Sequence, residues 1–377
     1  MKKLLIPLLI LLLFSVFIFS YVGRDDQIKV GIFYYVWYDE GFGNRHWNDT
    51  IYTIVVDEPY YYSYYSSQNK THLAKQIDLI ADLGVDFIII SWWGNNSYED
   101  NSTKILLEVL SEKNFPIKFC IMVEPYTDNP NYTFIYNYIY ENYVELYKDC
   151  YFKWEGKYLL CWFNPLNPPK NDSRFTDRVV GHENYVDWSL WNKKDDMKIS
   201  VDGEVTVCPR YDDYYLYKYG GRETYERHDV NYTEGMYQAE WDYVFDNIKD
   251  VKLVLIYSWN EYHERSMTEP HKDVSNPDIF LAYSQTKNYI QNLKAYSGLT
   301  IETFLKILIP LAFFVIVIYF FIIKPLMRRE RVSRTLPKKC VEWLNKKVKA
   351  RIYANKSHAI EILILKKMRE EKSCHPP

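Results

Sequence analysis

The chain has 377 residues, and its 46 basic and 49 acidic side chains leave a net charge of −3. The charge is unevenly divided, because residues 324–377 hold 16 basic and 5 acidic side chains, a net of +11, which leaves −14 for residues 1–323. The six cysteines are too few in a chain of this length for a dense disulfide framework, and the absence of a CxxC pair argues against a structural zinc site. We expect neither a metal nor another cofactor.

The N-terminal segment, residues 1–23, is predicted to be a signal peptide or a signal anchor, because an apolar run from Leu4 to Val22 follows two lysines. Buried strands are then predicted where aliphatic and β-branched residues cluster, at 27–38, 85–91, 117–123, 158–163, within 198–208, and in the run that begins at Val251. Helices are predicted where apolar residues recur at helical spacing, at 71–83, 101–113, 134–147, 236–248 and 279–296.

This alternation of strands and helices predicts an α/β fold with a parallel sheet. The length of residues 24–302 suits one (β/α)8 TIM barrel. Polar or aromatic residues follow the end of each clear strand, and in a barrel these positions lie on one rim. A doubly wound open sheet also alternates strands and helices, but no Gly-rich phosphate loop follows any of the predicted strands.

Residues 303–323 form a second apolar run, which is long enough to cross a membrane as a transmembrane helix. Basic residues crowd directly after this run, so the positive-inside rule places residues 324–377 in the cytoplasm and residues 24–302 outside it. The protein is therefore expected to be membrane-bound, with one span, or with two if the N-terminal segment stays uncleaved.

Seven N-x-S/T sequons fall within the segment predicted to lie outside the cytoplasm. Their crowding there favours a glycosylated outer domain. The acceptor asparagines are Asn48, Asn69, Asn95, Asn101, Asn131, Asn171 and Asn231.

The basic tail carries apolar residues at helical spacing among its lysines, namely Val341, Leu344, Val348 and Ile352. This pattern is typical of an amphipathic helix on the inner membrane face, which would make membrane lipid a partner. A solvated basic tail has the same composition. A tail tethered to a membrane is not expected to bind nucleic acid.

The segment Trp259-Asn-Glu-Tyr-His-Glu264, followed by Glu269, resembles the most characteristic motif of glycoside hydrolase family 99, the endo-α-mannosidases. Further parts of the resemblance follow the same order along the chain: Arg45-His-Trp47, His72, Gly84, Ser91-Trp-Trp93, Glu124-Pro-Tyr126 and the turn at 209–213. The resemblance implies a TIM barrel that binds and cleaves an oligosaccharide. Two positions depart from it, because the family usually has Trp at Tyr262 and Gly at Arg265. We expect Arg265 to crowd the site or to raise its affinity for an anionic sugar.

Cleavage of a glycosidic bond requires one carboxyl group to protonate the leaving oxygen and a second to assist attack. Glu261 and Glu264 are candidates, because both follow a buried strand and both can face the barrel mouth. The resemblance implies that Glu261 removes a proton from the sugar 2-hydroxyl, which closes onto C1 as an epoxide, and that Glu264 acts as acid and then as base. The alternative is a solvated pair of loop glutamates.

Other residues are candidates for holding the sugar. Glu124 is expected to bind sugar hydroxyls where cleavage occurs, or else to cap the next helix. Tyr211 either bonds near the catalytic pair or packs in a Tyr-rich loop, and His263 either orients a carboxylate or belongs to the framework. Because 18% of the chain is aromatic, most rings must serve the core. The remaining substrate-binding candidates are Tyr35, Trp37, Trp47, Trp93 and Asn260.

Three functions fit these observations. The first is a membrane-anchored retaining hydrolase of internal α-mannosidic or related α-linked bonds. The second is a catalytically inactive protein that binds glycans on the same barrel, although such a protein needs neither Glu261 nor Glu264. The third is a relative associated with polysaccharide biosynthesis, whose usual motif ends a strand in Trp-Asn-Glu without a residue of the His263 type.

The charged flanks of residues 303–323 generate a testable prediction of topology. Protease added to sealed membrane vesicles of native orientation, with the cytoplasmic side inside, is expected to digest residues 24–302 and to spare residues 324–377. Blotting with antibodies against each part measures this. Loss of the tail with protection of the larger segment would contradict the predicted orientation.

Overall fold

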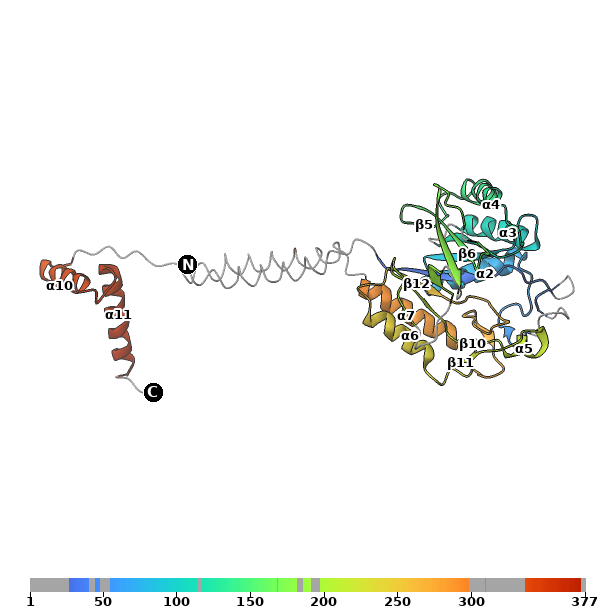
Figure 1. Cartoon of the computed structure of the whole chain (residues 1–377). Coiled ribbons are helices and arrows are strands. Elements are labelled where there is room, and N and C mark those ends of the chain that lie inside the picture. Colours follow the sequence, from blue (N-terminus) through green and yellow to red (C-terminus); the bar gives the residue numbers. More distant parts are fainter. Residues whose placement is uncertain are drawn as a thin grey trace. The chain divides into compact units, whose positions relative to one another are not determined.

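The computed structural model describes residues 27–40, 45–47, 55–113, 117–167, 169–181, 186–190, 197–297, 309 and 336–373. The chain divides into two compact units, residues 1–304 and residues 305–377 (Figure 1). The predicted membrane segments, residues 4–22 and all but one residue of 303–323, lie outside the described residues. Within the part that is described, no helix is both long and apolar enough to cross a membrane.

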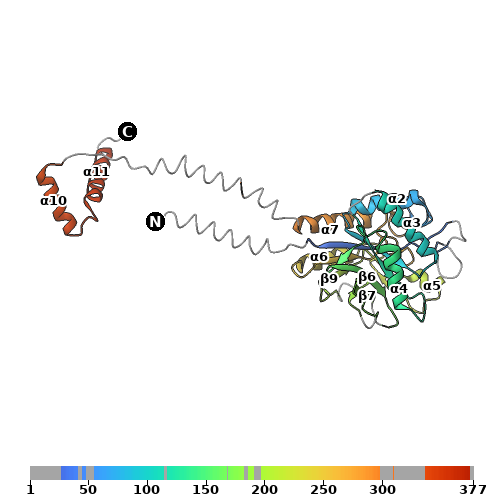
Figure 2. The ribbon, with the colours of Figure 1, turned by 90° about the horizontal axis from the view of Figure 1, so that it is seen from above.

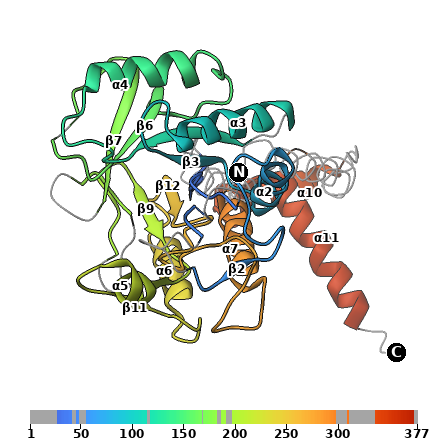
Figure 3. The ribbon, with the colours of Figure 1, turned by 90° about the vertical axis from the view of Figure 1, so that its right-hand side faces the viewer.

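The first unit is built on eight parallel strands that follow one another around a barrel in chain order (Figure 3). They are β1 (Lys29–Tyr34), β3 (Phe87–Trp92), β4 (Lys118–Val123), β6 (Lys157–Phe163), β7 (Phe175–Gly181), β8 (Trp188–Ser189), β9 (Glu204–Val207) and β12 (Leu253–Ile256). The last strand returns to the first, with Lys29 opposite Leu253. Between β8 and β9, which share no strand ladder in the described residues, Thr206 Oγ1 donates to the Ser189 carbonyl at 2.7 Å. The ring is nearly closed, which confirms the predicted TIM barrel.

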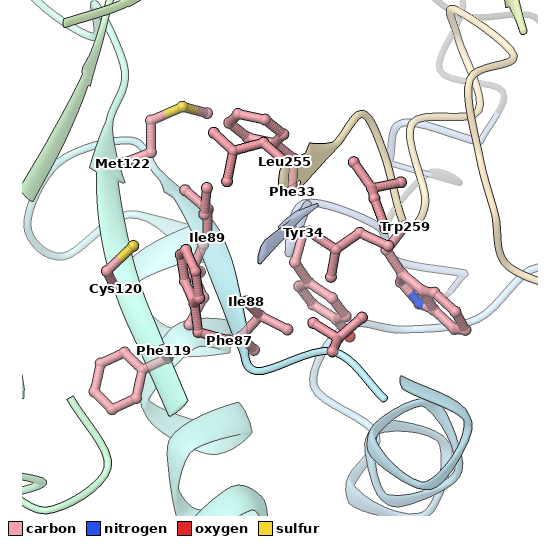
Figure 4. Packing of buried hydrophobic residues seen from close by; sticks show 14 of the residues in the cluster. Phe33, Tyr34, Phe87, Ile88, Ile89, Phe119, Cys120, Met122, Leu255 and Trp259 are labelled. Atoms are coloured by element: carbon pink, nitrogen blue, oxygen red, sulfur yellow. The ribbon is translucent and has the colours of Figure 1, made fainter. Parts of the chain in front are cut away.

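Strands such as β1, β3 and β12 form because their residues are apolar on both faces, as a sheet covered by helices on one side and by its own interior on the other requires. All six residues of β3 are buried. Figure 4 shows buried side chains from β1, β3, β4 and β12 packed together. Gly31 in β1 leaves the space that Phe87 and Leu255 fill, since a Cβ atom there would lie 2.5 Å from the Phe87 ring.

Helices cover the outside of the barrel, and Figure 2 shows α2, α3 and α7 on one side of it. The covering helices are α2 (Lys70–Leu83), α3 (Tyr98–Lys113), α4 (Tyr132–Ile139), α6 (Met236–Asp246) and α7 (Leu281–Ser297), while the short helix α5 (Tyr214–Gly220) buries none of its residues. Helix α2 begins where Asn69 accepts from the backbone N–H groups of Thr71 and His72. It ends at Gly84, whose φ of +85° is the left-handed conformation that glycine adopts without strain.

In the described residues, three short pairs of antiparallel strands accompany the parallel strands of the barrel. β5 (Lys153–Trp154) pairs with β6, β10 (Tyr211–Asp212) with β11 (Arg227–His228), and β2 (Glu58–Pro59) with β13 (His271–Lys272). The last two pairs lie in the long loops that follow β9, β1 and β12, so they give those loops a defined shape beside the barrel.

The sequence analysis missed two of the eight barrel strands, β7 and β8, and the short helix α5. β7 contains Asp177 and Arg178, and β8 has two residues, so neither shows an apolar run. The described residues between β6 and β9 contain no helix, so the alternation that predicts a barrel is interrupted there. The predicted helix 134–147 is also divided, because α4 ends at Ile139 and a single π-helical segment, η1 (Tyr140–Val144), follows it.

The predicted sequons lie mainly on the surface of the first unit. Asn69, Asn101, Asn131, Asn171 and Asn231 are exposed, Asn95 is half-buried, and Asn48 lies outside the described residues. Exposure is necessary for a glycan acceptor but does not show that a glycan is attached.

The described tail residues, 336–373, form two helices, α10 (Lys338–Lys349) and α11 (Lys356–Ser373), which contact each other. Helix α10 holds three of the four apolar positions predicted for an amphipathic helix, and Ile352 follows its end.

Candidate active site

The carboxyl ends of the parallel strands gather nearly all of the predicted site residues on one rim of the barrel. Glu124 directly follows β4, and Trp93 directly follows β3. Tyr35 and Trp37 follow β1, and Tyr211 begins β10 shortly after β9. The segment that carries Glu261, His263 and Glu264 follows β12.

Asn260 ties this segment to the end of β1. Its carboxamide accepts from the Tyr35 N–H and donates to the Tyr35 carbonyl, both at 2.8 Å, and it also donates to the Tyr65 hydroxyl at 3.1 Å. The side chain is fully buried. Asn260 was predicted to bind substrate, but its amide is occupied by these partners, so its role in the structure is to hold the loop in place.

Glu261 forms a buried pair with His263. The imidazole Nε2 donates to the His46 carbonyl at 2.7 Å, and Nδ1 lies 2.9 Å from Glu261 Oε1. Burial lowers the pKa of His263, but the Glu261 charge and hydrogen bond outweigh burial, so the net shift is upward. Burial raises the pKa of Glu261, the charge and hydrogen bond of His263 oppose that rise, the charge of Glu264 adds to it, and the net shift is upward. The imidazole of His263 lies between two oxygen acceptors, the His46 carbonyl and Glu261, which suits a protonated ring beside a carboxylate oxygen that accepts.

Glu264 lies in a more open and different environment, with its side chain 13% exposed. Arg222 Nη2 donates to its Oε1 at 2.6 Å, and the Tyr257 hydroxyl donates to its Oε2. Arg222 also donates to the Tyr211 hydroxyl at 3.1 Å. Tyr211 thus reaches the carboxylate through Arg222. The sequence analysis missed Arg222, because it lies in a polar loop after α5 and follows no strand.

Glu124 is the third carboxyl group of the rim. Ser91 Oγ donates to its Oε1 at 2.7 Å, and the Trp93 indole N–H donates to Ser91 Oγ at 3.1 Å. Burial raises the pKa of Glu124 to about 8, and the charges of Glu261 and Glu264 add to the rise. The three carboxyl groups therefore lie close enough to influence one another, and a pKa of about 8 keeps Glu124 neutral near pH 7.

Aromatic rings form a wall beside these carboxyl groups. The rings of Tyr35 and Trp37 stack with centroids 4.5 Å apart, and Trp37 and Trp93 are 6.2 Å apart and both half-buried. Such partly open rings are suited to the apolar face of a sugar. Trp47 is different: it is 2% exposed, stacks on Tyr38 at 3.9 Å, and donates its N–H to the Tyr65 carbonyl. Trp47 therefore packs behind the wall rather than on its open face.

Arg265 does not enter the mouth of the barrel, so the expectation that it crowds the site or attracts an anionic sugar is wrong. Its side chain is 2% exposed and contacts Asp57, Asp212 and Asp273 at 2.7–2.9 Å. Its φ of +51° is in the left-handed region. A glycine is the residue least strained there, which gives a physical reason for the glycine that the resemblance leads us to expect.

The ion-pair network around Arg265 includes a group that resembles a metal site. Ligand atoms of Asp57, His271 and Asp273 lie within 4.8 Å of one another. However, Arg210 and Arg265 both contact the carboxylates of Asp57 and Asp273, so the negative charge is already compensated by two buried guanidinium groups. These residues fit a structural salt-bridge network better than a cation site.

The chain is similar in fold to solved glycoside hydrolases. The structure of a family 99 endo-α-mannosidase from Bacteroides thetaiotaomicron matches 72% of this chain and 99% of its own, with 19% sequence identity and a TM-score of 0.53. A second structure of an enzyme so described from the same organism matches 73% and 99%, with 16% identity and a TM-score of 0.54. At these identities the likeness shows the fold alone. No protein-family model and no curated protein sequence matches the chain.

The buried position of Arg265 generates a prediction about stability. Replacing Arg265 with glycine is expected to lower the free energy of unfolding by about 3–5 kcal/mol, because buried aspartates lose a counter-ion. The relief of backbone strain at positive φ offsets only part of this loss. Urea unfolding measures the change. As a control, Arg222→Gln removes an arginine whose side chain is 41% exposed and is expected to cost less. Equal stability of Arg265→Gly and the unmodified chain would contradict the assigned role.

Glu124 generates a prediction about pH. Burial raises its pKa from 4.5 to about 8, so between these values the folded chain binds a proton at this side chain that the unfolded chain has lost. Raising the pH through this window therefore costs stability, and the neutral variant Glu124→Gln removes that cost. The melting temperature of Glu124→Gln relative to the unmodified chain is expected to be higher at pH 8 than at pH 5. A difference that does not change with pH would show that Glu124 is ionised throughout.

Proposed function

We propose that the chain is a retaining glycoside hydrolase that cleaves internal α-mannosidic, or related α-linked, bonds in glycans. The observation that carries the proposal is the pair Glu261 and Glu264. The two carboxylates leave the same loop at the barrel rim, yet one is paired with a buried imidazolium and the other with a half-exposed guanidinium and a phenol. Two carboxyl groups in contrasting environments are what separate acid and base roles require. The similarity in fold to family 99 enzymes supports the reaction class.

In the first step, the ionised Glu261 removes the proton from the sugar 2-hydroxyl. The freed oxygen attacks C1, and the bond from C1 to the leaving oxygen breaks. Glu264 gives its proton to that leaving oxygen, so no free alkoxide forms. His263 stabilises Glu261 as the base, since its imidazolium lies 2.9 Å from the carboxylate.

In the second step, water opens the epoxide at C1. Glu264, now ionised, takes a proton from the water, and Glu261 returns its proton to the 2-oxygen. C1 is inverted twice, so the product retains the original anomeric configuration. Arg222 and Tyr257 donate hydrogen bonds to Glu264 and hold its carboxyl group in place for this step.

The remaining rim residues hold the substrate. Glu124, neutral near pH 7, has a hydroxyl that can donate to a sugar oxygen as well as an oxygen that accepts. Trp37 and Trp93 are the half-buried rings available for stacking. The proposal extends to the location of the enzyme: residues 303–323 anchor it in a membrane, with the barrel outside the cytoplasm.

One observation favours the second candidate, a glycan-binding protein without catalytic activity. Arg222 and Tyr257 together engage both oxygens of Glu264, and a carboxylate held in this way is not the proton donor that the first step requires. The proposed hydrolase mechanism requires the substrate to displace either Arg222 or Tyr257 from Glu264. A biosynthesis-associated relative is less favoured, because its usual motif lacks the residue that here pairs with Glu261.

The division of labour between the two glutamates is tested by replacing each with glutamine. Each replacement is expected to reduce the cleavage rate of a natural α-linked oligosaccharide by about 10²–10⁴-fold. A fluoride leaving group needs no protonation, so Glu264→Gln should recover much of its activity on a glycosyl fluoride. Glu261→Gln should stay slow, because the 2-hydroxyl still lacks its base. Product analysis on α-linked manno- and gluco-oligosaccharides measures both the rates and the bond that is cut.

Equal rescue of both variants by the fluoride would reject the assigned roles. If neither substitution changed the rate, these residues would have no part in the reaction. Binding of the oligosaccharides without any cleavage by the unmodified chain would establish the glycan-binding alternative.

A further inference from the structure

The two tail helices leave much of their apolar surface uncovered. Within the described tail residues, 336–373, the pair buries only Leu344 and Ala359. Trp343 is 44% exposed, and Ile364 and Met368 are 55% and 52% exposed. Helix α11 carries four consecutive apolar residues, 362–365, so its middle turn is apolar on more than one side. A helix surface of this kind is normally covered by a partner or by lipid.

The apolar surface includes a groove between the two helices with a volume of about 590 Å³. Its wall is almost entirely apolar, while the side chains of Lys339 and Lys367 also line it. Lys347 lies over the Trp343 ring at 5.6 Å from its centroid. The groove therefore presents an apolar floor beside ammonium groups, and its occupant must offer apolar chains together with negative charge.

The positive charge of the tail indicates which kind of partner can occupy the groove between α10 and α11. Residues 336–373 contain eleven lysines and arginines and four glutamates, a net charge of +7. Two copies of this segment facing each other would repel, so a second copy of the chain is disfavoured. A surface of anionic phospholipids supplies both the acyl chains and the negative charge.

The position of the tail in the sequence supports the same occupant. Helix α10 begins shortly after the apolar run 303–323, and the intervening residues 324–337 include five basic side chains. A linker of this length keeps the tail within reach of any membrane that holds the apolar run. Each basic residue near an anionic leaflet adds to the attraction.

We propose that α10 and α11 lie on an anionic phospholipid surface, with the residues of the groove in contact with acyl chains and the surrounding lysines on the headgroup phosphates. The inference is independent of the proposed hydrolase activity. It assigns to the tail a lipid-binding surface formed by two helices, and Trp343 and Ile364 are the side chains expected to enter the lipid.

The test uses the full chain in lipid nanodiscs, in which both membrane faces are open to solvent. Discs of phosphatidylcholine alone are compared with discs that also contain phosphatidylserine, and hydrogen exchange is followed by mass spectrometry. Peptides from residues 338–349 and 356–373 are expected to exchange more slowly in the anionic discs, while peptides of the barrel are unchanged. Added salt is expected to weaken this protection, because the charges are near solvent.

Matched variants separate the apolar and the ionic contributions. Trp343→Ser in α10 and Ile364→Ser in α11 are expected to reduce the protection from exchange. Asn345→Ser, at an exposed polar position of α10, should leave the protection unchanged. Lys339→Gln and Lys367→Gln are each expected to shift the docking equilibrium about fivefold toward the free tail.

Equal protection of the tail helices in both kinds of disc would overturn the proposal. A tail that stays unprotected in both kinds of disc would also overturn it. Protection in detergent that grows with protein concentration would show instead that a second copy covers the groove, which also overturns it.

Discussion

The carboxamide of Asn260 continues the pairing of β1 with β12 beyond the point where the two strands end. The ladder runs to Ile32 opposite Ile256, the Trp259 N–H then donates to the Phe33 carbonyl, and Asn260 bonds both backbone groups of Tyr35. Because the amide is buried, leaving these groups without partners would be costly, so the loop after β12 has little freedom. The positions of Glu261, His263 and Glu264 depend on this attachment.

The loop after β12 separates two kinds of buried charge. The glutamates on the rim lie near one another, and Glu124 avoids part of the repulsion by staying protonated. Away from the mouth, Arg265 and Arg210 neutralise a cluster of aspartates, so the same loop is anchored by complete ion pairs. The same loop therefore carries the carboxyl groups of the rim and, through Arg265, is fixed to a buried ion-pair network.

The two units differ in how much of their apolar surface they bury. The barrel is nearly closed, and its large rings, such as Trp92 and Trp259, are fully buried. The tail pair is too small to enclose a core and leaves Trp343 and Ile364 exposed. The acidic segment that carries the barrel and the basic segment that carries the helix pair therefore differ both in the sign of their charge and in how much apolar surface they bury.

The sequence by itself determined the elements whose signal is local. The apolar runs of β3 and β4, the spacing of α2 and the polar residues at strand ends were sufficient to predict a barrel and the rim position of Glu261. β7 and β8 could not be predicted, because they are held in place by neighbouring strands rather than by an apolar pattern of their own. Which side of a turn a residue faces was likewise decided only by tertiary structure. Trp47 packs on Tyr38 and Arg265 on Asp57, while Arg222 reaches Glu264 from 42 residues away. Such directions depend on contacts between distant segments, and a single sequence contains no local pattern that records them.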